Sequence, residues 1–391
     1  MHHCRRQPRS SLQVTQPARA PRGTLQWFRL RACLLSAALL VGCVGPGSRF
    51  ARQPPNPVEV RAVIDSALPA AVSDRTGWAA DIAGAFIELG LPPTHENACA
   101  VVAVIQQESG FQADPVIPGL GRLALRTIDT RASHAGVPPA LVHAALDLKS
   151  SDGQTYIERI RAARTEKQLS DVYDDFIGRV PLGHRLFESW NPIRTRGPMQ
   201  VNVAFAERLE AVTPYPFHDS RRDLRRELFT RRASIYFGTA HLLDYQAPYD
   251  RYLYRFADYN AGQYASRNAA FQRAASIVAG KPLTADGALL AQDPEAESAG
   301  STERVLLAIA PQLRQSAAQI HEALEQGRSE SFESTALYRR VFMLADRKIG
   351  RRLPRAILPR IRLEGPKIVR PLTTGWYARR VNGRFERCLR G

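Results

Sequence analysis

One segment, residues 94–108, restricts the fold of this chain more than any other, because eight consecutive residues within it, Ala98 to Ile105, are apolar. A helix without a polar face has to be covered on all sides. Gly110 stands where this helix would end, since glycine adopts the left-handed conformation of a helix terminator without a steric penalty. The segment therefore predicts a buried central helix inside a shell of other helices.

The rest of the chain has mainly helical periodicity. Apolar residues recur at three- and four-residue spacing from Trp78 to Leu89, and almost nothing in the first 300 residues alternates with period two. Further helical segments are expected at residues 138–149, 153–165, 167–179, 221–246, 251–259, 264–279, 305–326 and 334–349. The Arg- and Pro-rich stretch 350–391 holds short apolar segments that are compatible with extended structure. The expected fold class is mainly α.

The first 42 residues have the composition of an export signal. They carry seven arginines and no Asp or Glu, and they end in an apolar run of eleven residues, 32–42. A membrane-spanning helix needs about 20 apolar residues, whereas the core of a signal peptide behind a basic flank has this shorter length. Leu40-Val41-Gly42-Cys43 resembles a bacterial lipobox, which implies cleavage before Cys43 and acylation of that residue. The alternative is an ordinary secretory signal with an incidental cysteine.

Removal of such a leader changes the charge that the mature chain presents. It would leave 47 Lys and Arg against 37 Asp and Glu, a formal balance of about +10. This balance favours an anionic partner, and for an exported lipoprotein that partner is expected to be a cell-envelope polymer rather than nucleic acid. A solvated basic surface is the alternative. Val44 in place of Asp after Cys43 resembles outer-membrane sorting in enterobacterial lipoproteins, with the protein facing the periplasm.

Two cysteines, Cys99 and Cys388, remain after the leader and Cys43 are set aside. In an oxidising compartment they can pair and tie the C-terminus to the early helices. Alternatively, Cys99 is only a small buried residue of its apolar run. No residue spacing indicates a metal site, and no cofactor is expected.

Glu108 is the principal candidate for chemistry. It lies in the last turn of the apolar helix, where partial burial and the negative end of the helix dipole both favour the protonated carboxyl and so raise its pKa. A carboxyl that stays protonated near neutral pH can act as general acid toward a glycosidic oxygen. The alternative is a glutamate at a helix end that merely faces water.

Four segments in order along the chain resemble one enzyme family. They are Glu108-Ser109-Gly110-Phe111, Gly197-Pro198-Met199-Gln200-Val201-Asn202, the helical segment 233–243 with Ile235, Gly238, His241 and Leu242, and Asp258-Tyr259-Asn260-Ala261-Gly262. They are similar to the Glu-Ser-Gly-Phe, Gly-Leu-Met-Gln, Ile-x-x-Gly-x-x-Tyr-Leu and Ala-Tyr-Asn-Ala-Gly motifs of the soluble lytic transglycosylases. That family is lysozyme-like and is related to the goose-type lysozymes. The layout also suggests an uncharacterised family of bacterial envelope lipoproteins.

The resemblance implies a lysozyme-like helical domain that acts on peptidoglycan glycan strands. Glu108 would protonate the oxygen between N-acetylmuramic acid and N-acetylglucosamine and then draw a proton from the muramoyl 6-hydroxyl, giving a 1,6-anhydro product without a second carboxylate. By the same resemblance, the substrate-binding residues would be Ser109, Met199, Gln200, Asn202, Tyr259 and Asn260. Asp114 and Glu188 remain alternative second carboxylates, and Trp190 either stacks on a sugar or belongs to the core.

The chain departs from the family in the spacing of its motifs. Residues 112–196, 85 in all, separate the first motif from the second, which indicates a helical insertion. Pro198 replaces a large apolar residue. Asp258 replaces a small one and would be either a partner of Tyr259 or on the solvent side of its helix. The insertion could close the cleft, so a catalytically inactive lysozyme-like lipoprotein that binds peptidoglycan or an envelope partner is one alternative. A structural lipoprotein with an unrelated helical fold is another.

The expected organisation follows from these boundaries. It consists of a lipoprotein signal peptide over 1–42, a tether over 43–75, a lysozyme-like domain over 76–280 with an insertion at about 119–190, and a C-terminal α-rich extension over 281–391.

Overall fold

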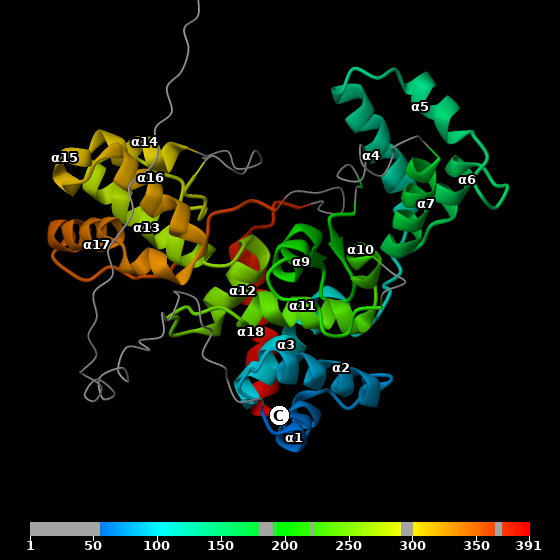
Figure 1. Ribbon diagram of the computed structural model, residues 1–391, viewed down its shortest axis with the longest axis horizontal. Coiled ribbons are helices and arrows are strands. Elements are labelled where there is room, and N and C mark those ends of the chain that lie inside the picture. The colour runs from blue at the N-terminus through cyan, green and yellow to red at the C-terminus, as the bar shows by residue number, and fades with distance from the viewer. Residues whose placement is uncertain (1–54, 180–190, 192, 220–222, 291–299, 364–369) are drawn as a thin grey trace, which may run out of the picture. The chain divides into compact units, whose positions relative to one another are not determined.

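The computed structural model describes residues 55–179, 191, 193–219, 223–290, 300–363 and 370–391. The predicted leader, the lipidation residue Cys43, and Glu188 and Trp190 lie outside the described residues. The described part is mainly α-helical, as expected for the fold class (Figure 1). Within it, no helix is both long enough and apolar enough to cross a membrane.

The described residues form three hydrophobic cores, and the first of them contains the predicted central helix. Residues Ala98 to Ile105 of α3 are buried at 2% exposure or less, which confirms the prediction of a helix covered on all sides. The Thr94 side chain caps α3 by accepting from the Asn97 amide at 3.1 Å. The elements that contribute to this core or border it are α1 (Pro57–Ala67), α2 (Arg75–Glu88), α3 (His95–Glu108), α9 (Val203–Glu210), α10 (Leu224–Glu227), α11 (Arg231–Leu243), α12 (Tyr252–Ala261), α18 (Thr374–Arg390), β1 (Thr195–Arg196) and β2 (Val201–Asn202).

The stretch expected as a tether, 43–75, contains the first described helix. Asn56 caps α1 by accepting from the Val58 amide at 3.0 Å, and Pro57 occupies the first helical position, where a missing N–H costs nothing. Val60 and Ile64 are fully buried in the first core. The Pro-rich sequence around residue 55 therefore starts a helix.

The helices of the predicted insertion form a second core together with Ile193. Thr155 and Thr165 each begin a helix with a capping box, in which the side chain three residues later bonds back to the cap amide. Leu120, Tyr156 and Ile160 are among the residues of this core. Its helices are α4 (Leu120–His134), α5 (Pro139–Leu146), α6 (Tyr156–Ala162) and α7 (Glu166–Gly178).

A third core begins with α13, before the expected boundary at residue 280. Phe271 and Ala275 of α13 pack with residues of α17, including Val341 and Phe342. The elements of this region are α13 (Ala265–Ala279), α14 (Ser301–Ala308), α15 (Ala310–Leu313), α16 (Ala317–Glu325), η2 (Gln326–Arg328), η3 (Glu330–Ser334) and α17 (Ala336–Ile349).

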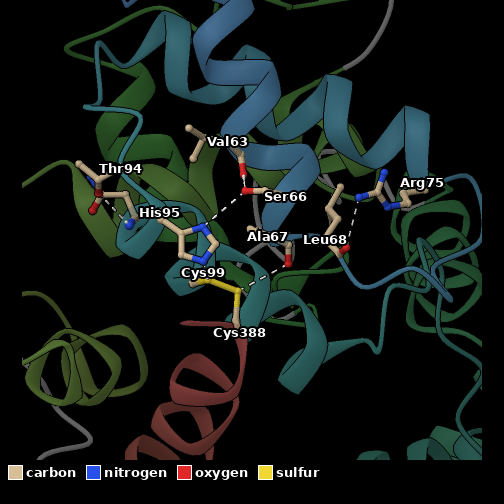
Figure 2. Close-up of a disulfide and its surroundings, with 10 residues drawn as sticks. Val63, Ser66, Ala67, Leu68, Arg75, Thr94, His95, Cys99 and Cys388 are labelled. Carbon is tan, nitrogen blue, oxygen red and sulfur yellow. Dashed lines mark hydrogen bonds between the residues drawn. A yellow bond between two sulfur atoms is a disulfide. The ribbon is translucent and has the colours of Figure 1, made fainter. Parts of the chain in front are cut away.

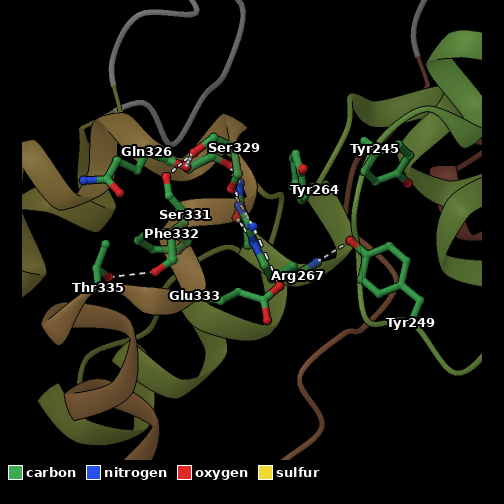
Figure 3. Close-up of polar contacts among 12 residues, drawn as sticks. Tyr245, Tyr249, Tyr264, Arg267, Gln326, Ser329, Ser331, Phe332, Glu333 and Thr335 are labelled. Carbon is green, nitrogen blue, oxygen red and sulfur yellow. Dashed lines mark hydrogen bonds and ion pairs between the residues drawn. The ribbon is translucent and has the colours of Figure 1, made fainter. Parts of the chain in front are cut away.

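A buried arginine holds the loops of the third core. Arg267 is 1% exposed, and its guanidinium donates to the carbonyl oxygens of Gly327 at 2.7 Å and Ser329 at 2.8 Å (Figure 3). The same group lies 4.1 Å from the centre of the Tyr264 ring and 3.8 Å from a Glu333 carboxylate oxygen. A buried charge is tolerated only when it is paired and hydrogen-bonded, as Arg267 is.

The last helix, α18, returns the chain to the first core. It packs along α3 and α12 and buries Tyr377, Val381 and Phe385 there (Figure 1). These residues are four apart and so share one helix face. The stretch 350–391, which is expected to be compatible with extended structure, thus ends in a helix. Its apolar residues are spaced four apart among many arginines, so the helical pattern is weak in the sequence. The region 281–391 accordingly contributes to two cores.

Candidate functional site

The Glu108 carboxyl is bonded to one tyrosine and acts electrostatically on a second, and both tyrosines come from other helices. Glu108 is the last residue of α3 and is half-buried. Its Oε1 accepts a hydrogen bond from the hydroxyl of Tyr377 at the start of α18. Burial and the negative charge of Glu108 raise the pKa of Tyr377 well above its usual value, and the same two causes act on the pKa of Tyr259 in α12. Both tyrosines therefore remain neutral donors at physiological pH.

Tyr259 joins two of the four motifs. Its hydroxyl donates to the carbonyl oxygen of Met199 at 2.6 Å. Met199 is fully buried, and its amide donates to the Ser234 hydroxyl of α11 at 3.0 Å. A side chain at Gly238 would come within 2.6 Å of the Met199 sulfur, so glycine is required there for Met199 to fit. Residues of the second, third and fourth motifs thus meet around Met199.

His241 closes the same cluster from α11. Its Nε2 donates to the Tyr259 carbonyl oxygen at 3.2 Å. Its ring packs edge-on against Phe205 at 4.3 Å and against Tyr259 at 5.1 Å, measured between centroids. His241 therefore supports the position of Tyr259.

The segment 197–200 forms the turn of the β1–β2 hairpin. Thr195 pairs with Asn202, and the Gln200 amide donates to the Gly197 carbonyl oxygen at 2.9 Å. Gly197 has φ of +69°, and Gln200, which is not a glycine, has φ of +50°. A non-glycine residue in the left-handed region stores strain of about 1 kcal/mol or more, and such residues concentrate at functional sites.

Replacement of Gly197 by Ala is expected to destabilise the protein by about 2 to 5 kcal/mol. The new Cβ would lie 2.3 Å from the Leu228 carbonyl oxygen and 2.5 Å from Ser234 Cβ, in addition to the left-handed φ penalty. Urea unfolding measures the loss. Gly110→Ala is the matched control, because its φ is +59° but nothing lies within 4 Å, so it should cost only about 1 kcal/mol. Equal losses in both variants would contradict the steric argument.

The insertion reaches the hairpin through a residue that the sequence did not single out. The Gln200 side-chain amide donates to Glu166 Oε2 at 2.9 Å, and its oxygen accepts from the Thr195 hydroxyl at 2.8 Å. Glu166 is the first residue of α7. A glutamate at the start of a helix is common, so the sequence pattern does not mark Glu166 as a site residue. Its position in the predicted insertion is the one sequence signal that could have indicated it.

Three other predicted site residues make contacts that support the fold. The Ser109 hydroxyl donates to the Ile105 carbonyl oxygen at 3.1 Å within its own helix end. Asn202 caps α9 by accepting from the Phe205 amide at 3.2 Å. Asn260 is exposed and accepts from the Thr374 hydroxyl at 2.7 Å, a bond that links α12 to the start of α18. Asp114 is exposed in the loop that follows α3.

Asp258 has neither of the two positions considered for it. It is fully buried, and its carboxyl accepts from the hydroxyls of Tyr249 at 2.7 Å and Tyr245 at 3.0 Å. It also accepts from the amides of Ser266 at 2.6 Å and Tyr264 at 3.0 Å. The solvent-side alternative is therefore wrong. Asp258 secures the turn between α12 and α13, and burial raises its pKa to about 6.

Titration of Asp258 and titration of His241 should have opposite effects on the free energy of unfolding as pH changes. Burial lowers the pKa of His241 from 6.5 to about 4, so stability from this group is lost as pH falls from 6.5 to 4. Burial raises the pKa of Asp258 from 3.8 to about 6, so stability from this group is lost as pH rises from 3.8 to 6. Each effect is worth about 3 kcal/mol and they should nearly cancel. In His241→Gln only the Asp258 effect remains, so the free energy of unfolding measured in urea should fall as pH rises from 4 to 6.

A matched control is His134→Gln, because His134 is exposed at the end of α4, a helix of the second core. The control should keep the pH profile of the unchanged protein. If the difference in unfolding free energy between His241→Gln and the unchanged protein does not vary from pH 4 to 6.5, then His241 is not a buried neutral group.

A disulfide fixes the far end of α18. Cys99 of α3 is bonded to Cys388 of α18, with the Cα atoms 5.6 Å apart (Figure 2). The Tyr377–Glu108 hydrogen bond joins the same two helices near their opposite ends. Because α18 is fastened to α3 at both ends, Tyr377 has little freedom to leave Glu108.

Comparison with known proteins places these residues in one family. Residues 71–390 match the family described as "Protein of unknown function (DUF1615)". The chain belongs to this family. It is also 47% identical over 357 residues to the "Uncharacterized protein YaiW" of Escherichia coli (strain K12), a match that covers 91% of this chain and 97% of that protein. No solved structure matches the chain. The DUF1615 match includes Glu108, Tyr259, Tyr377 and both disulfide cysteines.

Proposed function

We propose that this protein is a lytic transglycosylase that cleaves the β-1,4 bond between N-acetylmuramic acid and N-acetylglucosamine in peptidoglycan, on a lysozyme-like fold. The observation that carries the proposal is the convergence of the four motifs. The Tyr259 hydroxyl donates to the Met199 carbonyl oxygen, and Met199 packs against Gly238 of α11. The negative charge of Glu108 raises the pKa of the same tyrosine.

The reaction needs one carboxyl. Glu108 donates its proton to the glycosidic oxygen, and the bond from that oxygen to C1 of the muramoyl sugar breaks, leaving an oxocarbenium-like centre. The Glu108 carboxylate then takes the proton of the 6-hydroxyl while O6 bonds to C1. Atoms balance without water, and the enzyme returns to its protonated state. A single residue serves as acid and then as base, unlike the two-carboxylate scheme of most glycosidases.

Tyr377 acts as a positioning residue in this scheme. Its hydroxyl bonds to Glu108 Oε1 and so fixes the orientation of the carboxyl that must meet the glycosidic oxygen. On the same helix, Arg384 lies within electrostatic range of Glu108, with Arg380 and Arg387 nearby. Positive charge beside the carboxyl suits a polymer whose peptide stems carry carboxylates.

Tyr377→Phe is expected to lower the rate of muropeptide release from sacculi by about tenfold and to move the alkaline limb of the pH–rate profile to higher pH. The hydroxyl stabilises the ionised carboxyl, so its loss leaves Glu108 protonated to higher pH. The measurement is the rate of muropeptide release from sacculi across pH. Tyr338→Phe is the control, because that hydroxyl lies in the third core. A loss of rate with an unchanged pH profile would mean that Tyr377 serves the fold alone.

The lipid anchor is part of the same proposal. Acylated Cys43 would hold the protein on the bacterial outer membrane, facing the periplasm and its peptidoglycan glycan strands. Metabolic labelling with an alkynyl fatty acid tests this, since Cys43→Ser should lose the label if Cys43 is the acceptor.

Digestion of purified sacculi in water enriched in oxygen-18 tests the activity. Transglycosylation gives 1,6-anhydro ends without the heavy isotope, because O6 of the sugar itself closes the ring. Hydrolysis gives reducing ends that carry it, which would make the protein a lysozyme and point to a second carboxylate. Absence of both products with all preparations of sacculi would overturn the enzymatic proposal.

The second candidate is a lysozyme-like protein that binds peptidoglycan, or an envelope partner, without cleaving it. The Glu166 carboxylate of the insertion is bonded to the amide of Gln200, a residue that lines the cleft in the family resembled. Such a contact would keep Gln200 from a sugar. Retention on sacculi without release of any muropeptide, unchanged in Glu108→Gln, would favour this candidate.

A further inference from the structure

A histidine lies against the disulfide that joins α3 to α18. The ligand atoms of His95, Cys99 and Cys388 all lie within 4.8 Å of one another. His95 and Cys99 are four residues apart on α3 and therefore share one face of the helix. The His95 Nε2 atom is 3.6 Å from the Cys99 sulfur (Figure 2).

The other ring nitrogen of His95 has a partner that sets its orientation. His95 Nδ1 is 3.5 Å from the Ser66 hydroxyl oxygen, and that hydroxyl donates its own hydrogen to the Val63 carbonyl oxygen at 2.8 Å. The hydroxyl hydrogen is used, so the serine oxygen can accept from Nδ1–H. In that tautomer the Nε2 lone pair faces the Cys99 sulfur. Metal-binding histidines have this arrangement, in which an outer partner on one nitrogen directs the other to the ion.

The spacing of the nitrogen and the sulfur fits one shared ion. Zinc bonds to sulfur at about 2.3 Å and to histidine nitrogen at about 2.0–2.1 Å with tetrahedral angles, which places the two ligand atoms about 3.5–3.6 Å apart. The observed separation of His95 Nε2 from Cys99 Sγ is 3.6 Å. The nitrogen could therefore bind an ion held by the Cys99 sulfur without a change of its distance from that sulfur.

We propose that the reduced Cys99–Cys388 pair, completed by His95, binds one Zn²⁺ ion. A dithiol reductant supplies two electrons and two protons, the sulfur–sulfur bond breaks, and the reductant becomes a disulfide. Zn²⁺ then displaces one proton from each thiol, and both protons pass to solvent. Two thiolates and a neutral imidazole give three protein ligands, and water takes the fourth position.

The metal would take the place of the disulfide as the cross-link between α3 and α18. Cys388 belongs to the last turn of α18, and its sulfur is 3.5 Å from the Ala67 carbonyl oxygen at the end of α1, so three helices meet at the site. In the reduced chain, bound Zn²⁺ stabilises the folded state by mass action. The inference uses none of the residues assigned to catalysis and does not rest on the proposed function.

The test uses the purified full-length protein with Cys4, Cys33 and Cys43 replaced by serine, so that Cys99 and Cys388 are its two remaining cysteines. It compares the oxidised form with the form reduced by a phosphine that is then removed under inert gas. Zinc is titrated against a chromophoric chelator, and cobalt(II) is used in parallel for its visible absorption bands. We expect one zinc per reduced chain, none per oxidised chain, and cobalt bands typical of tetrahedral thiolate ligation. Zinc should also protect both cysteines from alkylation. Failure of the reduced chain to bind zinc would overturn the proposal.

Variants separate a ligand from a neighbour. His95→Gln should weaken zinc binding by about 100-fold or more, and Ser66→Ala, which removes an outer partner, by about 10-fold. His321→Gln is the control, because this exposed histidine lies in the third core region and should bind as the unchanged protein does. If reduction unfolds the chain, circular dichroism with and without zinc shows whether zinc restores the helices of the reduced chain. The proposal would also be overturned if zinc failed to restore the fold and its binding did not depend on His95.

Discussion

Glu108→Gln is expected to lower the release of 1,6-anhydro-muropeptides from sacculi by about 10²–10⁴-fold, the usual contribution of a general acid–base residue. The amide cannot give a proton to the glycosidic oxygen or take one from the 6-hydroxyl. Its oxygen can still accept the Tyr377 hydrogen bond, so the geometry around α3 and α18 should persist. Chromatography and mass spectrometry of the soluble products measure the rate.

The matched control is Glu96→Gln, at the exposed first turn of the same helix. It makes the same chemical change and should leave the rate unaltered. The thermal midpoint of Glu108→Gln should stay close to that of the unchanged protein, because a half-buried carboxyl is replaced by a group of equal size. Equal rates for Glu108→Gln and the unchanged protein would remove Glu108 from the mechanism.

The double variant Cys99→Ala/Cys388→Ala is expected to lose about 5 kcal/mol of unfolding free energy. The two cysteines are 289 residues apart, so the disulfide closes a very long loop and removes much entropy from the unfolded chain. Cys99 is fully buried, and alanine leaves only a small gap there. Urea unfolding followed by tryptophan fluorescence measures the change in zinc-free buffer.

A local effect should accompany the global one. Hydrogen exchange of α18 should accelerate more than that of α13, because α18 loses its attachment to α3 while the third core is untouched. Cys388→Ala alone should behave as the double variant does, since either substitution removes the cross-link. A double variant as stable as the unchanged protein would show that packing of Tyr377, Val381 and Phe385 suffices to hold α18.

Much of the local structure follows from sequence patterns. Eight apolar residues in a row have to form a covered helix, and α3 is buried as predicted. Helical segments are predicted at 138–149, 153–165 and 167–179, and α5, α6 and α7 lie there. These features depend on residues that are near one another in the chain, so periodicity and capping signals report them directly.

Other residues were assigned a position that packing then changed. Asp258 was considered for the solvent side of its helix, yet two tyrosine hydroxyls and two amides enclose it. The partners come from the loop before α12 and the start of α13, and no periodicity in a single helix encodes them. Glu166 was missed for the same reason, since its contact with Gln200 depends on how the insertion docks.

The sequence by itself determined the mainly α-helical class, the buried character of α3, the position of Glu108 at its end and the order of the four motifs. Only the tertiary structure decided what surrounds the Glu108 carboxyl. Tyr377 lies 269 residues further along the chain, on a helix whose arginines conceal its apolar stripe. A contact between residues so far apart in the chain exists because the free energy of α18 is lower when it covers α3 than when its apolar residues face water. That balance depends on the summed burial of Tyr377, Val381 and Phe385 against a surface that forms only once the other helices have packed.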